Sequence, residues 1–328
     1  WFNYIDFPTF LKLYIALYLG MTIFLSINVF RKYTYKLTFS FNEIQSKELV
    51  VYGLYVLAGG ASAILVSKVD MVMIGKLIGY KEVAFYTVAY FIGNVVRVPA
   101  RAIGSICMPL VARAWGNDDL VAIKDIYVKS AINQLILGGL IFLGVWLNID
   151  DALSLFPAKF QGGRLVVFFI AFSQLFNVST GVNGLIIANS KYYRFDLYSN
   201  FMLLCFTLFT NFIFIPSTSP LAAYDIVGIN GAAFATLLSV FFFNTIKMMF
   251  MYWKMGIQPF SIKTLYTVFL LSIIYYLSFY IPVTENVYFN FLWRSFCVLL
   301  LFIPAMYLLN LSKDINQVIL DITKKIIK

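Results

Sequence analysis

Two arginines stand near the middle of a long apolar run. The run extends from about Ala84 to Val111 and contains Arg97 and Arg101 with no acidic residue beside them. An arginine at the bilayer centre costs roughly 2.5–3.5 kcal/mol on insertion scales, so an unpaired pair requires a wet cavity or an anionic ligand. The spacing of four residues places both guanidinium groups on one helix face, and Asn94 extends that face. This pattern indicates binding of an anion in an internal space.

Pro99 lies between the two arginines. It removes one helix hydrogen bond and predicts a kink at membrane depth, which is tolerated where the freed carbonyls face protein or water. The alternative is that Arg97 and Arg101 snorkel or satisfy carbonyls in a helix interface. Each lies about a dozen residues from either end of the run, roughly 15–18 Å at 1.5 Å per residue, which is too deep for easy snorkelling. We therefore interpret both as cavity residues that bind substrate.

Asp70 is the acidic residue that the sequence places nearest to membrane depth, just beyond the second apolar segment. Its carboxylate either pairs with Lys68, Lys76 or an arginine, or carries a coupling proton or cation. Alternatively, Asp70 ends its helix at the outer interface, and the sequence does not choose between these interpretations. Asp70 is the candidate for coupling.

Polar side chains also recur at helical spacing in a later apolar segment, at Gln174, Asn177 and Thr180. Such side chains hydrogen-bond either the hydroxyl groups of a ligand or a neighbouring helix, and the second use is the commoner one in membranes. The same two interpretations apply to Asn133 and Gln134. Gln174 and Asn177 join Asn94 as candidate substrate-binding residues.

The composition is that of a membrane protein. Hydrophobic residues make up 61% of the chain and charged residues 12%, whereas about a quarter of a soluble domain is charged. Histidine is absent, and the three cysteines lie in apolar runs without paired spacing. We therefore expect no metal site, no cofactor, no disulfide and no catalytic residue. The net charge of +10 does not indicate nucleic acid, because the basic residues are scattered between apolar segments.

Nine apolar segments reach the length of about 20 residues that a transmembrane helix needs. They cover residues 8–30, 48–69, 84–111, 130–149, 164–188, 197–216, 229–252, 264–282 and 288–309. We expect an all-α polytopic membrane protein with nine transmembrane helices. Basic residues gather in alternate connections, among them Lys247, Lys254 and Lys263, which we assign to the cytoplasmic side; this bias predicts a cytoplasmic carboxy terminus.

The carboxy-terminal tail is polar on one side and apolar on the other. It places Ile315, Val318, Ile319, Ile322 and Ile326 at helical spacing, with lysines opposite. This periodicity predicts a basic amphipathic helix that lies on the lipids of the inner leaflet.

Several runs of the sequence, in this order and spacing, are similar to one family. They are VDMVMIGKLIGYKEVAFYTVAYFI at 69–92, RVPARAIGSICMPLVAR at 97–113, IIANSKYYR at 186–194, VGINGAAFATLLS at 227–239 and GIQPF at 256–260. Together they resemble the bacterial polysaccharide flippases of the multidrug/oligosaccharidyl-lipid/polysaccharide exporter superfamily. Because the chain starts at Trp1 without a signal-peptide pattern, we interpret it as the carboxy-terminal part of a longer protein.

The resemblance implies an architecture of two six-helix lobes around a central cavity. In this chain, residues 1–30 would hold the last helix of a missing first lobe and 31–47 a cytoplasmic linker. Residues 48–252 would form the second six-helix lobe, 253–309 would hold two additional transmembrane helices, and 310–328 is the tail.

The resemblance also implies a function in surface polysaccharide biosynthesis, such as that of the O-antigen of lipopolysaccharide. The substrate would be a polyprenyl-diphosphate-linked oligosaccharide, flipped across the bacterial inner membrane by alternating access with the amino-terminal lobe. Arg97 and Arg101 would contact the diphosphate. A multidrug exporter or a peptidoglycan-precursor flippase of the same superfamily is the alternative. A membrane-embedded glycosyltransferase is disfavoured, since the sequence has no large outer loop or carboxylate pair for acid–base catalysis.

Overall fold

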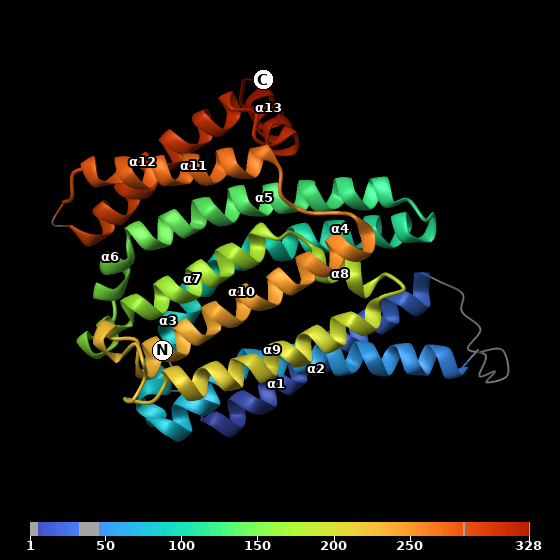
Figure 1. Cartoon of the computed structure of the whole chain (residues 1–328), viewed down its shortest axis with the longest axis horizontal. Coiled ribbons are helices and arrows are strands. Elements are labelled where there is room, and N and C mark those ends of the chain that lie inside the picture. Colours follow the sequence, from blue (N-terminus) through green and yellow to red (C-terminus); the bar gives the residue numbers. More distant parts are fainter. Residues whose placement is uncertain (1–5, 33–45, 285, 328) are drawn as a thin grey trace. The chain divides into compact units, whose positions relative to one another are not determined.

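The computed structural model describes residues 6–32, 46–284 and 286–327, and every regular element in this part of the chain is a helix (Figure 1). The longer helices are α1 (Phe7–Lys32), α2 (Ser46–Leu77), α3 (Tyr80–Asn94), α4 (Val98–Gly116), α5 (Leu120–Leu147), α7 (Arg164–Ser179), α9 (Tyr193–Phe214), α10 (Gly228–Met255), α11 (Ile262–Leu277), α12 (Val287–Leu308) and α13 (Lys313–Ile327). The short helices are α6 (Ile149–Ser154) and α8 (Asn183–Ala188), and 3₁₀ turns include η2 (Val95–Arg97). The expected all-α fold is confirmed.

The chain divides into two compact units, Trp1–Val51 and Tyr52–Lys328. The first contains α1 and the start of α2, and most of the linker predicted at 31–47 lies outside the described residues. The second contains the remaining helices. The finer lobe boundaries expected from the sequence stay predictions.

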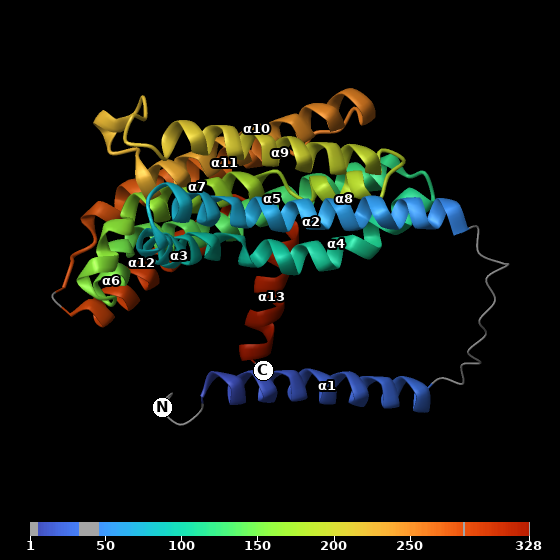
Figure 2. The same ribbon diagram turned by 90° about the horizontal axis from the view of Figure 1, so that it is seen from below.

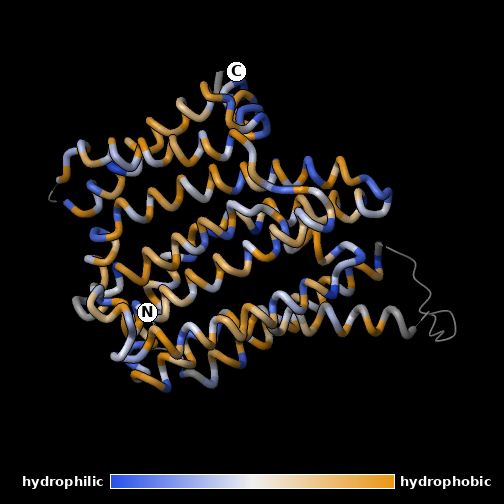
Figure 3. The backbone as a smooth tube through the Cα atoms, viewed as in Figure 1, coloured by the Kyte–Doolittle hydropathy of each residue, from blue (hydrophilic) through white to orange (hydrophobic). Residues whose placement is uncertain are grey.

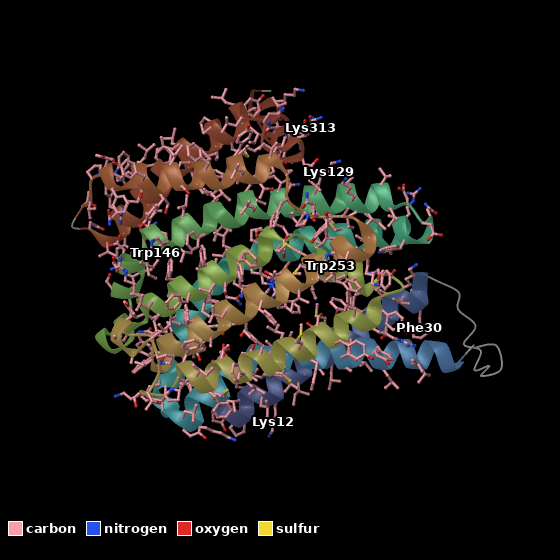
Figure 4. The ribbon with its side chains drawn as sticks, in the orientation of Figure 1. Lys12, Phe30, Lys129, Trp146, Trp253 and Lys313 are labelled. Carbon is pink, nitrogen blue, oxygen red and sulfur yellow. The ribbon has the colours of Figure 1, made fainter. Side chains whose placement is uncertain are left out.

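Seven helices in the described part are long and apolar enough to cross a membrane, which makes this a multi-pass membrane protein. They account for seven of the nine predicted segments. The other two differ: segment 48–69 lies within α2, some of whose side chains are outside the description, and segment 164–188 is divided between α7 and α8. Figure 3 shows hydrophobic residues, in orange, along the length of the helices. Trp146 and Trp253 lie near the ends of α5 and α10 (Figure 4), where interfacial aromatics are expected.

Three apolar clusters hold the second unit together. The first joins α2, α3, α6, α7 and the start of α10, and includes the fully buried Tyr86 and Ile170. Another joins α4, α5, α8 and the end of α10 around Tyr127 and Met251. These two clusters contain opposite ends of α10, and polar residues such as Ser239 and Asn244 lie between them along that helix.

The third cluster attaches α11 and α12 to α5. Phe302 of α12 is 1% exposed within it, and the contact with α5 is close: a Cβ added at Gly139 would lie 2.4 Å from Leu271 of α11. Ile315 and Ile319 of α13 also pack against this cluster. Figures 1 and 2 both show α13 following α12. The predicted carboxy-terminal helix is therefore present, and its contact with lipids stays a prediction.

Two of the long helical segments are interrupted. Between α3 and α4 the chain passes through η2, where the Val98 amide donates to the Val95 carbonyl in the tighter 3₁₀ pattern. Pro99 follows in the first turn of α4, where its missing amide is harmless. The helix is therefore interrupted directly before the proline from which a kink was predicted.

The second interruption corrects the single span predicted at 164–188. The chain between α7 and α8 turns at Gly181, which has φ +64°. A Cβ at this position would lie 2.9 Å from Ser130 Oγ and 3.0 Å from the Ala131 amide nitrogen on α5. Glycine permits both the left-handed backbone and this close approach to α5.

Candidate functional site

A polar cavity of about 430 Å³ lies within the second unit. Its walls come from α2, α3, η2, α4 and α5, from α7 and α8 with the turn between them, and from α9 and α10. The polar side chains that line it are Asp70, Tyr90, Arg97, Arg101, Gln134, Gln174, Asn177, Asn183, Asp196, Asn200, Thr207, Thr236, Ser239 and Lys247. Both helix interruptions therefore border the cavity, which satisfies the rule that irregular backbone at membrane depth faces protein or water.

Arg97 ends η2 and Arg101 lies in the first turn of α4, and the structure brings both to the cavity wall as predicted. Both side chains are exposed, and neither takes part in any salt bridge found among the described residues. The cavity therefore contains two guanidinium groups that form no salt bridge with any carboxylate of the described residues.

Asn94 does not join the two arginines. It is the last residue of α3 and lies outside the cavity lining, and its buried Oδ1 has no hydrogen-bond partner in the described part of the chain. The physical reason is η2: three residues per turn replace 3.6 there, so the face expected for a continuous α-helix is not preserved across residues 95–97. The expectation that Asn94 shares the face of the arginines is wrong.

Asp70 is buried in α2, with 5% of its surface exposed, rather than at a helix end near the interface. Its carboxylate accepts hydrogen bonds from Tyr86 Oη at 2.8 Å, Asn211 Nδ2 at 2.8 Å and Thr236 Oγ1 at 2.5 Å. All three donors are neutral, and no described lysine or arginine forms a salt bridge with Asp70. Asn211 also has a buried Oδ1 for which the described residues provide no hydrogen-bond partner. Asp70 is thus an acidic residue at the cavity that has no cationic partner among the described residues.

Gln174 and Asn177 both line the cavity, and they also belong to a hydrogen-bond network between α7, α8 and α10. Its centre is Asn244, which is fully buried: Nδ2 donates to Asn177 Oδ1 at 3.0 Å, and Oδ1 accepts from Thr180 Oγ1 at 3.0 Å and Asn183 Nδ2 at 3.1 Å. These side chains therefore join helices and face the cavity at the same time.

Asn133 and Gln134 separate. Gln134 lines the cavity, whereas Asn133 faces away from it. Asn133 Nδ2 donates to Asp314 Oδ2 at 2.8 Å and its Oδ1 accepts from Ser312 Oγ, so this residue attaches the start of α13 to α5. For Asn133, the interpretation as a residue that joins helices is confirmed.

Two charged residues of the cavity escaped the sequence reasoning. Lys247 lies within α10 and is 3% exposed, so its assignment to a cytoplasmic connection is wrong. Its Nζ lies 2.7 Å from Asp196 Oδ1, in the first turn of α9. Asp196 directly precedes a predicted span and Lys247 lies near the end of another, so each resembled an interfacial charge. The separation of 51 residues in sequence gave no sign of the pairing.

Residues 61–213 match the family model for MatE. This segment is a MatE domain. The match covers just under half of the chain, and this part of the protein is similar to the MatE family of membrane transporters, which are not enzymes. The matched segment contains Asp70, both arginines and Asp196, and α10 with Lys247 follows it. No curated protein and no solved structure matched the chain.

Proposed function

We propose that the protein is the carboxy-terminal part of a flippase that moves a polyprenyl-diphosphate-linked oligosaccharide across the bacterial inner membrane, for surface polysaccharide biosynthesis. The observation that supports this substrate is the unneutralised pair Arg97 and Arg101 on the wall of a polar cavity. The MatE domain supports transport, and the cavity chemistry supports the choice of an anionic substrate.

The physical task is to lower the free energy of a diphosphate and a sugar inside the membrane while the lipid tail stays in hydrocarbon. Fixed guanidinium groups replace the water that the diphosphate loses, and their planar geometry allows bidentate contacts. Gln134, Gln174 and Asn177 provide amide groups on the same cavity that suit sugar hydroxyls. In this proposal the sugar contacts α5 and α7, and the diphosphate contacts η2 and α4.

Transport requires that the cavity face each leaflet in turn, and we propose that this lobe rocks against an amino-terminal lobe of the same protein. Asp70 is the coupling residue in this proposal. Its three neutral hydrogen-bond donors leave a buried negative charge that a proton or a monovalent cation would neutralise, and the free Asn211 Oδ1 is a further oxygen ligand beside it.

Complementation tests the proposed function. The full-length gene is expressed in a bacterium that lacks its own oligosaccharide flippase, and surface polysaccharide is scored for the wild type, for Arg97→Gln/Arg101→Gln and for Arg113→Gln. Arg113 is the matched control, because it is exposed near the end of α4 and does not line the cavity.

We expect the wild type and the Arg113 variant to restore polysaccharide and the double variant to fail, with equal amounts of all three proteins in the membrane. Restoration by the double variant would refute the role of the arginines. Failure of the wild type would refute the substrate. The same assay with lipid-linked peptidoglycan precursor separates the related flippase, whose diphosphate would use the same arginines.

Asp70 favours a second candidate, an exporter of cationic drugs, because it is a buried carboxylate on the cavity without a cationic partner among the described residues. An exporter of this kind would raise drug resistance in a sensitive host, and Asp70→Asn would abolish the effect. The absence of any resistance, together with restored polysaccharide, would exclude this candidate.

A further inference from the structure

The ion pair of Asp196 and Lys247 is the most buried salt bridge in the described part of the chain. The lysine side chain is 4% exposed and the aspartate side chain 24%, whereas the partners in the other two salt bridges are at least half exposed. The pair joins α9 to α10 and borders the same cavity as Arg97 and Arg101. It therefore places a third cation beside the proposed substrate site.

A structural role alone does not explain this pair. Removing two charges from water carries a desolvation penalty, and replacing a buried ion pair with apolar residues is often neutral or stabilising. The interface of α9 and α10 already has apolar contacts of this kind, such as Phe206 stacked on Phe242 with ring centroids 4.4 Å apart. Association of the two helices does not require a buried lysine.

We propose that Lys247 is a third cationic contact for the substrate's diphosphate and that Asp196 holds the ammonium group until the phosphate oxygens replace the carboxylate. The inference rests on the proposed function, which it extends from two substrate-binding cations to three. It makes the ion pair an internal counter-ion that the anionic substrate exchanges.

The surroundings of the pair suit such an exchange. Asn200 Nδ2 donates to the second carboxylate oxygen of Asp196 at 3.2 Å, so the carboxylate keeps a partner when the lysine leaves. The Lys247 ammonium lies 4.2 Å from the centre of the Phe243 ring, and this cation–π contact stabilises the cation without a negatively charged partner. An ammonium has three donors, so it accommodates phosphate oxygens as well as the carboxylate.

Gly184 leaves room around the ammonium. A Cβ at this position in α8 would lie 3.2 Å from Lys247 Nζ and 3.8 Å from Asp196 Oδ1, and Gly184 itself lines the cavity. Because glycine has no side chain here, nothing from this position of α8 covers the ammonium, and Lys247 itself lines the cavity. The pair is thus accessible to a ligand although most of the lysine stem is buried.

Binding of inorganic diphosphate to the purified chain in lipid nanodiscs tests the inference. The affinity is measured by calorimetric titration for the wild type, Lys247→Gln, Asp196→Asn and the double variant Asp196→Asn/Lys247→Gln. The exposed Lys254, on the last turn of the same helix, provides the control Lys254→Gln. The double variant leaves neither partner as an unpaired buried charge, so it reports on binding even if a single variant folds poorly.

We expect the affinity of Lys247→Gln and of the double variant for diphosphate to fall by about tenfold or more, as the loss of one charge-assisted contact predicts. Asp196→Asn binds more tightly than the wild type, because the competing carboxylate is gone. Lys254→Gln binds like the wild type.

Two results would overturn the inference: wild-type affinity in the double variant, or an Asp196→Asn variant that folds but binds as weakly as Lys247→Gln. Absence of binding to the wild type would overturn it as well. Failure of the proposed function is a separate result. If Arg97→Gln/Arg101→Gln abolishes binding and the Lys247 variants do not, the inference fails and the flippase proposal stands. If binding depends on Lys247 but the gene does not restore polysaccharide, the chain has the anion site and the flippase proposal fails.

Discussion

Gly181→Ala tests whether the turn between α7 and α8 needs glycine. The new residue would have to adopt φ near +64°, and a left-handed backbone costs a non-glycine residue about 1–2 kcal/mol. Its Cβ would also press on Ser130 Oγ at 2.9 Å and the Ala131 nitrogen at 3.0 Å, and such overpacking costs about 1–3 kcal/mol. Together these effects predict a loss of about 2–5 kcal/mol in the free energy of unfolding.

The measurement is thermal unfolding of the purified chain in nanodiscs, with Gly144→Ala as the control. A Cβ at Gly144 would have no neighbour within 4 Å, so alanine in this helix interior stabilises by about 0.5–1 kcal/mol. At about 2–4 °C per kcal/mol, the Gly181 variant should melt roughly 4–20 °C below the wild type. Asparagine tolerates the left-handed backbone, so Gly181→Asn should lose mainly the packing part. A Gly181→Ala variant as stable as Gly144→Ala would refute the reasoning.

Two further substitutions test a hydrogen bond at the cavity and the close approach of α9 to α10. Thr236→Val removes one hydrogen-bond donor from Asp70 and should lower the free energy of unfolding by about 1.5–3 kcal/mol in the same thermal assay. The control Thr245→Val, whose hydroxyl donates within its own helix, should change the free energy of unfolding by less than about 0.5 kcal/mol. Gly231→Ala would place a Cβ 1.8 Å from the Phe214 carbonyl oxygen, a backbone atom that does not yield without separating α9 from α10. We expect no folded Gly231→Ala protein by size-exclusion chromatography; a normal elution profile would contradict the close approach of these helices.

Hydropathy alone predicted most helices of this fold, because every backbone group in a bilayer must be satisfied within its own helix. It failed where a short apolar sequence does not stay helical. Pro99 indicates the first interruption, because it has no backbone amide to donate within a helix, and the structure has a 3₁₀ turn directly before it. The sequence around Gly181 contains no proline, and its turn depends on contacts with Ser130 and Ala131 of α5, about 50 residues earlier. Such a turn is a tertiary feature that periodicity cannot indicate.

For the cavity, the sequence indicated the residues whose charge stands out within an apolar run. Arg97 and Arg101 were found in this way, Asp70 was found as the acidic residue nearest to membrane depth, and all three line the cavity. Lys247 and Asp196 were missed because charge near the end of a predicted span has an ordinary explanation in the interface. Only the helix register of α9 and α10 shows that these two side chains meet inside the protein.

The number of charges on the cavity wall does not by itself select an anion. Three cations and two carboxylates border the cavity, so its formal charge is small. What distinguishes the cations is their pairing: Lys247 contacts a carboxylate at 2.7 Å, whereas Arg97 and Arg101 have no such partner in the described part of the chain. Asp70 does not neutralise any of these cations through a direct contact, because its three hydrogen bonds come from neutral donors. The free positive charge therefore lies at η2 and the start of α4.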